Sequence, residues 1–370
     1  MRLRLGLGGF LVVLVTGAVL FQSGASSVMS ASSSKPAPMR LLPDFGNPAG
    51  HAHVPPAGEA VGTKHPDHVI GTGTPATCTS AEVVKAIASG GVITFNCGPE
   101  PTTITMTATA KVVNSSHRIV LDGGGTVTLS GAGKRQILYM NTCDPRQEWT
   151  TTHCYDQEWP ELVVQNITFE DGNSTLSQSK GASFGGGGGG AIFDLGGRLK
   201  VVNSRFNDNR CYHVDPDLGG AAIRALAQWH NAPVYITNDT FEGGQCSNGG
   251  ALSSIGVSWV VLNTLMTNND AIGYGATPPE AGTPGGGSGG AIYCDGDTYS
   301  LEIEGTAFRN NRAREGGGAI FLVSNDDTAT LTIENSTLAD NPSAGFWTRA
   351  YPGIFFQSSG QPNVVDSSLS

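Results

Sequence analysis

The phrase Gly189-Gly190-Ala191-Ile192 recurs with small changes four more times, as Gly219-Gly220-Ala221-Ala222, Gly249-Gly250-Ala251-Leu252, Gly289-Gly290-Ala291-Ile292 and Gly317-Gly318-Ala319-Ile320. Each copy is followed by a short run of alternating apolar residues. The copies recur at intervals of about 28 to 40 residues, a period at which short strands and glycine turns build a solenoid. Each unit of a solenoid buries its apolar face against the next, so the copies predict one elongated body.

A second phrase lies between these copies and contains one large apolar residue, usually followed by Asn three positions later. The pairs are Phe206 with Asn209, Met266 with Asn269, Phe308 with Asn311 and Leu338 with Asn341, while Phe169 and Phe241 have Gly172 and Gly244 instead. A further Asn stands three residues before the apolar position in five units: Asn166, Asn203, Asn238, Asn263 and Asn335. Three of these begin N-x-S/T triplets, which can mark glycosylation. We expect instead that they stack at a bend and bond to one another and to the backbone.

The composition agrees with many short strands joined by tight turns. The 370 residues include 52 Gly and 20 Pro, and only 14% are charged, which fits neither a helical bundle nor a charge-rich disordered chain. No helical stretch is long enough to cross between strands. We therefore predict an all-β fold, a single-stranded right-handed parallel β-helix of about eight coils, with its handedness following the usual chirality of parallel connections.

An N-terminal cap is expected before the first coil. Cys78 and Cys97 bracket residues 80–88, which read as a short amphipathic helix, and residues 90–95, which read as a strand. A disulfide between these two cysteines would fix a cap over the first open rung, whose strand edges would otherwise be exposed.

Seven cysteines in an exported chain invite pairing. Cys143 and Cys154 flank a polar excursion and are expected to close it. Cys211 and Cys246 each stand five residues after the large apolar position of their unit. Equivalent positions in successive coils lie about 4.8 Å apart, which a disulfide tolerates. The same position in later units is Ala271 and Ala313, so it is expected to point inward, and Cys294 is left as a buried thiol.

The chain divides into three parts. Residues 1–25 have the pattern of a secretory signal peptide, with Arg2 and Arg4 before the apolar run 5–21, although an uncleaved anchor is an alternative. Residues 26–76 are rich in Ser, Pro and Gly and are expected to form a flexible linker, whose four His could otherwise hold a metal. Residues 77–370 then form the β-helix domain. We expect a monomer that is secreted or associated with the cell surface, with no membrane span in the mature chain.

The formal net charge is −10, and no basic stripe is present. Nucleic acid, whose phosphates demand Lys and Arg, is therefore excluded as a partner.

The two phrases together, between Gly189 and Asn341, resemble the repeats of the polymorphic outer membrane proteins of chlamydiae and of secreted proteins in the pectate-lyase-like superfamily. The resemblance implies the right-handed β-helix. It does not specify a reaction, because this architecture carries lyases, hydrolases, esterases, adhesins and inert spacers alike.

Candidate functional residues are sought on the loops, because a regular rung offers only packed side chains. The first loop candidate is Tyr212 to Asp217. Tyr212 could stack on a sugar, Arg210, His213, Asp215 and Asp217 could serve catalysis, and Asp208, Asp215 and Asp217 could bind Ca²⁺. The structural interpretation of the same residues is an ordinary polar loop without a function. Two further candidates, for which structural interpretations are also available, are Asp295-Gly296-Asp297 and the group Arg312, Arg314, Glu315, Asp326 and Asp327.

Two functions follow from these observations. The first is a non-catalytic role in adhesion or carbohydrate contact through the long lateral face, with a polysaccharide or a cell-surface ligand as partner. The alternative is a polysaccharide lyase acting on uronic-acid polymers, so whether the protein is an enzyme is left open. Ca²⁺ is the only cofactor that these carboxylates suggest. Of the tryptophans, Trp259 and Trp347 are expected in the core or a cap because they lie in strand-like runs.

Overall fold

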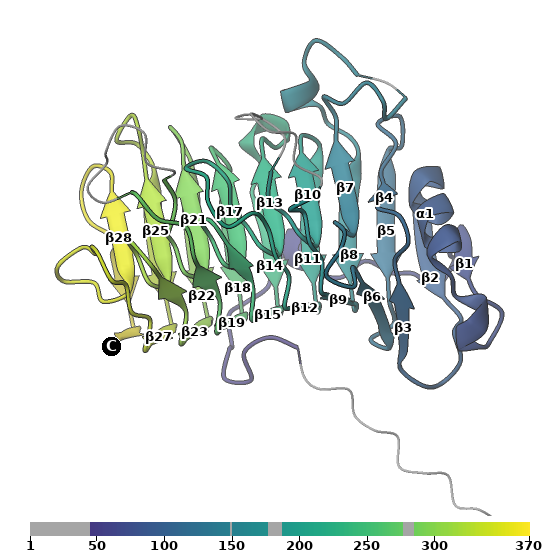
Figure 1. Cartoon of the computed structure of the whole chain (residues 1–370), viewed down its shortest axis with the longest axis horizontal. Coiled ribbons are helices and arrows are strands. Elements are labelled where there is room, and N and C mark those ends of the chain that lie inside the picture. Colours follow the sequence, from purple (N-terminus) through teal and green to yellow (C-terminus); the bar gives the residue numbers. More distant parts are fainter. Residues whose placement is uncertain (1–44, 149, 177–186, 277–284) are drawn as a thin grey trace, which may run out of the picture. The chain divides into compact units, whose positions relative to one another are not determined.

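The computed structural model describes residues 45–148, 150–176, 187–276 and 285–370. All of them belong to one unit, Leu42–Ser370, whereas a second unit, Met1–Leu41, lies outside the described residues together with the predicted signal peptide. The described chain winds into a right-handed parallel β-helix (Figure 1), and every pairing between its named strands is parallel. The predicted fold class is confirmed.

Four sheets, named A to D here, run along the solenoid. Sheet A contains β1 (His68–Ile70), β2 (Gly91–Phe95), β5 (Arg118–Asp122), β8 (Glu161–Gln165), β11 (Arg198–Val202), β14 (Val234–Thr237), β18 (Trp259–Leu262), β22 (Ser300–Glu304), β26 (Thr330–Glu334) and β29 (Asn363–Val365). Sheet B contains β3 (Thr102–Thr105), β6 (Val127–Ser130), β9 (Thr168–Glu170), β12 (Arg205–Asn207), β15 (Thr240–Glu242), β19 (Leu265–Thr267), β23 (Ala307–Arg309), β27 (Thr337–Ala339) and β30 (Ser368–Leu369).

Sheet C contains β4 (Ala110–Lys111), β7 (Leu138–Asn141), β10 (Ile192–Leu195), β13 (Ile223–Leu226), β17 (Leu252–Ile255), β21 (Ile292–Asp295), β25 (Ile320–Val323) and β28 (Ile354–Gln357). Sheet D is short, with β16 (Gln245–Cys246), β20 (Asp270–Ala271) and β24 (Arg312–Ala313). Each coil takes one strand from A, then B, then C, and three coils add a strand of D between B and C. The described residues thus complete the expected eight coils.

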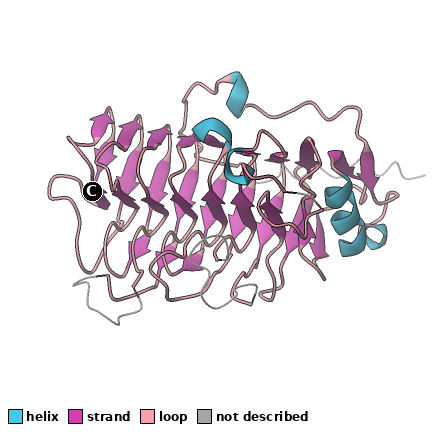
Figure 2. Cartoon of the chain, turned by 90° about the horizontal axis from the view of Figure 1, so that it is seen from above, coloured by secondary structure: helices cyan, strands magenta, loops and turns pink. Residues whose placement is uncertain are grey.

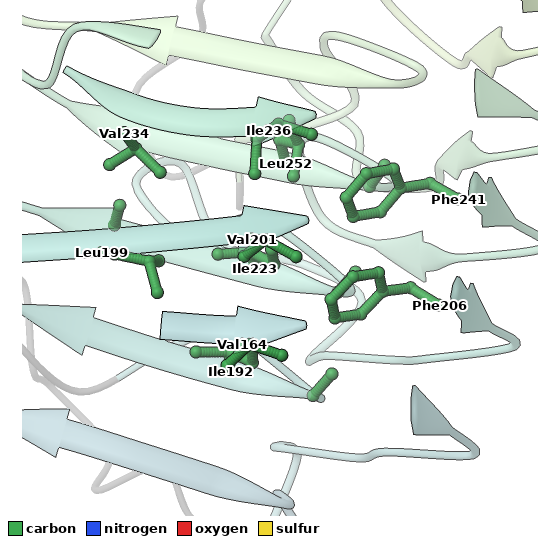
Figure 3. Packing of buried hydrophobic residues seen from close by; sticks show 14 of the residues in the cluster. Val164, Ile192, Leu199, Val201, Phe206, Ile223, Val234, Ile236, Phe241 and Leu252 are labelled. Carbon is green, nitrogen blue, oxygen red and sulfur yellow. The ribbon is translucent and has the colours of Figure 1, made fainter. Parts of the chain in front are cut away.

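The core is a stack of like residues from successive coils (Figure 3). Val164, Val201 and Ile236 of sheet A face Ile192, Ile223 and Leu252 of sheet C across the interior. The large apolar position of the second phrase forms a third row on sheet B. The rings of Phe206 and Phe241 there are parallel, with centroids 4.7 Å apart. Burial of such rows against their neighbours is the main stabilising term of the fold.

The glycine phrase marks the bend before five of the eight strands of sheet C, from β10 to β25, but its second copy is displaced by one residue from the predicted alignment. Ile192 pairs with Ile223, so Gly189 corresponds to Gly220 rather than to Gly219. Gly189 and Gly220 have φ of 61° and 72°, a left-handed conformation that favours glycine. A shift of one residue would turn every side chain of β13 to the wrong face, so the buried Ile223 sets the register.

The asparagines before the apolar position form the expected ladder. Asn166, Asn203 and Asn238 all have left-handed backbones, and each donates from Nδ2 to an oxygen of the preceding coil. The bond from Asn238 to Asn203 Oδ1 is 2.7 Å long. The triplets at Asn166 and Asn238 therefore follow from the repeat, because their amides are already used.

The predicted cap is present. Helix α1 (Ser80–Ser89) begins after Thr79, whose side chain accepts from the backbone N–H of Glu82, and it covers one end of the strand stack (Figure 2). Val83 and Ile87 are fully buried on its inner face. Four 3-10 turns complete the helical elements of the described residues: η1 (Pro56–Gly58), η2 (Pro75–Thr77), η3 (Cys154–Asp156) and η4 (Trp229–Asn231).

All three predicted disulfides are formed: Cys78–Cys97, Cys143–Cys154 and Cys211–Cys246. The Cα atoms of Cys211 and Cys246 lie 4.7 Å apart, and strand pairing places Ala271 next in the same buried row. Cys294 is a free, fully buried thiol, as expected, and burial raises its pKa to about 12. Three disulfides indicate folding in an oxidising compartment.

The flexible linker predicted for residues 26–76 is wrong for residues 45–76. These residues lie against the solenoid, and β1 pairs with β2 at the start of sheet A. Composition was misleading here because the segment is held mainly through its backbone, to which Gln165 and Asn263 bond. The described residues contain no helix that is both long and apolar enough to span a membrane.

Candidate functional site

A lateral groove of about 980 Å³ lies near the C-terminal end of the described coils. Asn310, Asp340, Asp270, Arg312 and Trp347 are among its lining residues. A second hollow of about 380 Å³ shares Asp270 and Arg312 with the first and continues past Arg314. The two hollows thus form one surface feature with Arg312 in the middle.

Strand pairing in sheet D explains why these side chains come together. Arg210 bridges Gln245, Gln245 pairs with Asp270, and Asp270 pairs with Arg312. One polar row therefore runs along the outside of the solenoid, opposite the buried row of Cys246, and its last two members lie in the groove. The predicted alignment of Arg210 with Arg312 is confirmed.

The groove contains an ion pair whose arginine has further N–H donors. Arg312 Nη2 lies 2.6 Å from Asp270 Oδ2, and this hydrogen bond raises the pKa of Arg312. The Arg312 side chain is 68% exposed, whereas that of Asp270 is 13% exposed. A guanidinium has five N–H donors, so the arginine can hold a ligand while it keeps its carboxylate partner. Arg314 lies beside it, with its guanidinium 4.8 Å from the centroid of the Tyr274 ring.

Asn269 and Asn341 form the floor of the groove and belong to a second asparagine ladder. Asn269 donates to Asn311 Oδ1, and Asn311 donates to Asn341 Oδ1, each over 2.9 Å. All three side chains are buried, and their Nδ2 atoms also bond to strand carbonyls. Such a fully satisfied polar network fixes the floor and leaves the rim residues to meet a ligand.

Trp347 is the exposed aromatic residue of the groove. Its side chain is 54% exposed, so the expectation of a core role is wrong for this residue. Trp259, by contrast, is fully buried and donates its Nε1–H to Ser254 Oγ. An open aromatic face beside amides and charges is the combination that binds sugars, which have apolar ring faces and hydroxyl edges.

The predicted site residues divide between two places. Arg210 is exposed in the row along sheet D. Asp208 has a left-handed backbone, and its negative charge, after burial and the charge of Asp171, helps to raise the pKa of Glu170. Asp215 and Asp217 belong to one loop beside Arg224. Burial lowers the pKa of Arg224, and the negative charges of these two residues partly oppose that shift. Among the described residues no group of three or more His, Cys, Asp or Glu is placed to share a metal ion, so the proposed Ca²⁺ set of Asp208, Asp215 and Asp217 is not assembled there.

The loop from Tyr212 to Asp217 is nevertheless well anchored. Ser247 Oγ donates to the Asp215 carbonyl over 2.7 Å and accepts from the Asp215 N–H over 2.9 Å. Burial, followed by the charge of Asp215, raises the pKa of Asp217. Tyr212 and His213 remain exposed, with ring centroids 4.6 Å apart.

Arg224 is a buried charged residue that the repeat pattern does not mark. It takes the outward position between Phe193 and Ser253, donates to Ser253 Oγ, and also donates to the Asp217 carbonyl. Burial lowers its pKa to about 10. Its clearest role is to hold the loop against sheet C. Only strand alignment could have revealed it, as a charge in a row that is otherwise largely aromatic.

The other two sequence candidates also have clear places. Asp295 Oδ1 accepts from the Gly296 N–H in a turn, which is the structural interpretation of that motif. Asp326 likewise holds a turn, by accepting from the Thr328 N–H. Only Arg312 and Arg314 of the third group line the groove.

Comparison with known proteins gives one short match. The model of the Chlamydia polymorphic membrane protein repeat matches residues 305–322, which contain one copy of each recurring phrase. No curated protein and no solved structure matches the chain. The match agrees with the repeat resemblance.

Proposed function

We propose that the protein is a secreted or cell-surface β-helix that binds carbohydrate in its lateral groove and does not transform it. The observation that carries this proposal is the exposed Trp347 beside the Arg312–Asp270 ion pair in one groove. The buried asparagine floor supports it, because a rigid site loses little entropy on binding. The disulfides and the surface-protein repeat support an extracellular location.

A binding experiment tests the proposal. The purified chain is titrated by calorimetry with a panel of neutral and acidic polysaccharides, and Trp347→Ala is expected to weaken any binding about tenfold or more, since a large aromatic contact is lost. Tyr155→Ala is the matched control, because Tyr155 is also an exposed aromatic residue but does not line the groove. Equal affinity of Trp347→Ala and the unmodified chain would place binding elsewhere.

A lyase acting on uronic-acid polymers is the second proposal. The exposed Tyr212–His213 pair, on the same loop as Asp215, is the observation that favours it. Incubation with such polymers, with and without Ca²⁺, would be followed by the ultraviolet absorbance of unsaturated products. A rise in absorbance that is lost in Asp215→Ala would support a lyase, and no product from any polymer with the fold intact would contradict it.

A further inference from the structure

The N-terminal arm, residues Gly46 to Asp67, crosses the outer face of sheet A from late coils back to the first. Its end at Asn47 donates from Nδ2 to the Gly305 carbonyl, and its other end at Asp67 donates its N–H to the Val92 carbonyl. In Figure 1 the purple segment that contains η1 passes behind β14 and β11, in agreement with its contacts. The arm therefore spans most of the coils while belonging to none of them.

Two amide side chains of the body hold the backbone of the arm. Asn263 Oδ1 accepts from the Ala52 N–H over 2.7 Å, and its Nδ2 donates to the Ala52 carbonyl over 2.9 Å. Gln165 repeats this arrangement with Val61, at 2.8 and 2.9 Å. Each side-chain amide thus accepts from the N–H and donates to the carbonyl of one arm residue, as the backbone of a neighbouring β-strand would. The asparagine ladder stops at Asn263 for this reason, because its amide bonds to the arm instead of to Asn238.

The surface below the arm differs from the surface beyond it. One outward row of sheet A runs from Val120 through Val163, Lys200, Tyr235 and Val260 to Glu302. Val120, Val163 and Val260 are buried, although they are not part of the interior core. Lys200 is the one charged member below the arm, and its Nζ donates to the Glu59 carbonyl of the arm over 2.9 Å. The outward row is therefore mostly apolar where the arm lies, and its single charge there is used to hold the arm.

We propose that the N-terminal arm is a releasable latch, which docks only after the coil carrying Asn263 is wound and which opens without unfolding of the body. The partners of its first half, Asn263 and the Gly305 carbonyl, are 211 and 258 residues away in sequence, so this part of the docking surface does not exist until the later coils have formed. The arm itself buries few apolar side chains, chiefly Ala52 and part of Val54, so its opening is a local event that leaves the interior core intact. Opening exposes an apolar strip on the body.

Hydrogen exchange of the full chain tests the latch. The Ala52 and Val61 amides are expected to exchange more slowly than a free peptide but faster than the Val201 amide in the core. Asn263→Ala is expected to speed exchange at Ala52 about tenfold or more while leaving Val201 unchanged, because a paired amide contact is lost. Asn335→Ala is the matched control, since it removes the same repeat position in a coil that the arm does not reach.

A second variant keeps the test independent of body stability. Ala52→Pro removes the donor N–H on the arm itself and leaves the body unaltered. Faster exchange along the arm in this variant, with an unchanged melting temperature of the body, supports the latch. Exchange of the arm at the same rate as Val201, or no response to either substitution, would show that the arm unfolds only with the body and would overturn the proposal.

Discussion

At the scale of single residues, two fully buried aspartates, Asp194 and Asp239, stand out in the repeat. Asp194 faces the interior of sheet C, where Oδ2 accepts from Gln228 Nε2 over 2.6 Å and Oδ1 has no hydrogen-bond partner among the described residues. Burial raises the pKa of Asp194 well above its ordinary value. Asp239 is also buried, in a row where neighbouring coils have Ser or Thr, and burial raises its pKa as well. Both carboxyls are therefore favoured in their protonated form.

This burial predicts a pH dependence of stability. A carboxyl with a raised pKa in the folded state binds its proton more tightly there than in the unfolded chain. Its contribution is fully present below the unfolded pKa of about 4 and is lost as the pH rises through the folded pKa. Asp194→Asn removes the titrating group and can keep the bond from Gln228. The variant is expected to show a smaller fall in the free energy of unfolding above about pH 4.

Urea denaturation of both proteins at a series of pH values measures this effect. Asp239 is present in both, so the difference between the two curves reports Asp194 alone. Parallel curves would mean that Asp194 does not change its protonation on folding in that range.

At the scale of elements, the disulfide Cys211–Cys246 links two successive coils beside sheet D. Ala271 and Ala313 occupy the same buried row, so alanine fits this position. The double variant Cys211→Ala with Cys246→Ala is expected to lose about 3 kcal/mol of unfolding free energy, because the unfolded chain regains the entropy of a closed loop. Urea midpoints measure the loss. After reduction of all disulfides the midpoints of the variant and the unmodified chain should converge, because neither then contains a bridge. An unchanged midpoint of the oxidised variant would contradict the expected constraint.

The elements show which features a repeat pattern can reveal. Rows such as Phe206 with Phe241, and the cysteine pair five residues later, were predictable because equal spacing in sequence becomes vertical stacking in a solenoid. The displaced copy at Gly220 was not, because two adjacent glycines leave the register open until Ile223 is seen to be buried. The arm has no period in the sequence. It depends on contacts between residues far apart along the chain, such as Ala52 with Asn263.

The same limit applies to the site. Arg312 could be assigned to the same repeat position as Arg210, but its ion pair depends on which residue the adjacent coil places there, and that residue is Asp270. Trp347 lies in a run that reads as a strand, and its exposure follows from the turn that the end segment makes in the structure. The predicted loop at Asp215 is present, but Asp208, Asp215 and Asp217 form no metal-binding group among the described residues.

At the scale of the whole molecule, stabilising features are unevenly distributed along the solenoid. All three disulfides lie between Cys78 and Cys246, the helical cap covers the first coils, and the arm reaches as far as Gly305. The coils after Gly305 have none of these. Val364 and Leu369 of the last strands pack against the core but are only partly buried.

A solenoid couples each coil mainly to its neighbours, so such unevenness predicts unfolding from one end. Amides of β26 and β27 are expected to exchange faster than those of β8 and β11, by subglobal opening that spares the disulfide-linked coils. Hydrogen exchange followed by mass spectrometry at increasing urea measures the order of release. Reduction of the disulfides should narrow the difference, because the early coils then lose their constraint while the late coils lose nothing. Simultaneous release of all coils in the oxidised protein would show instead that the stacked core rows couple the molecule from end to end.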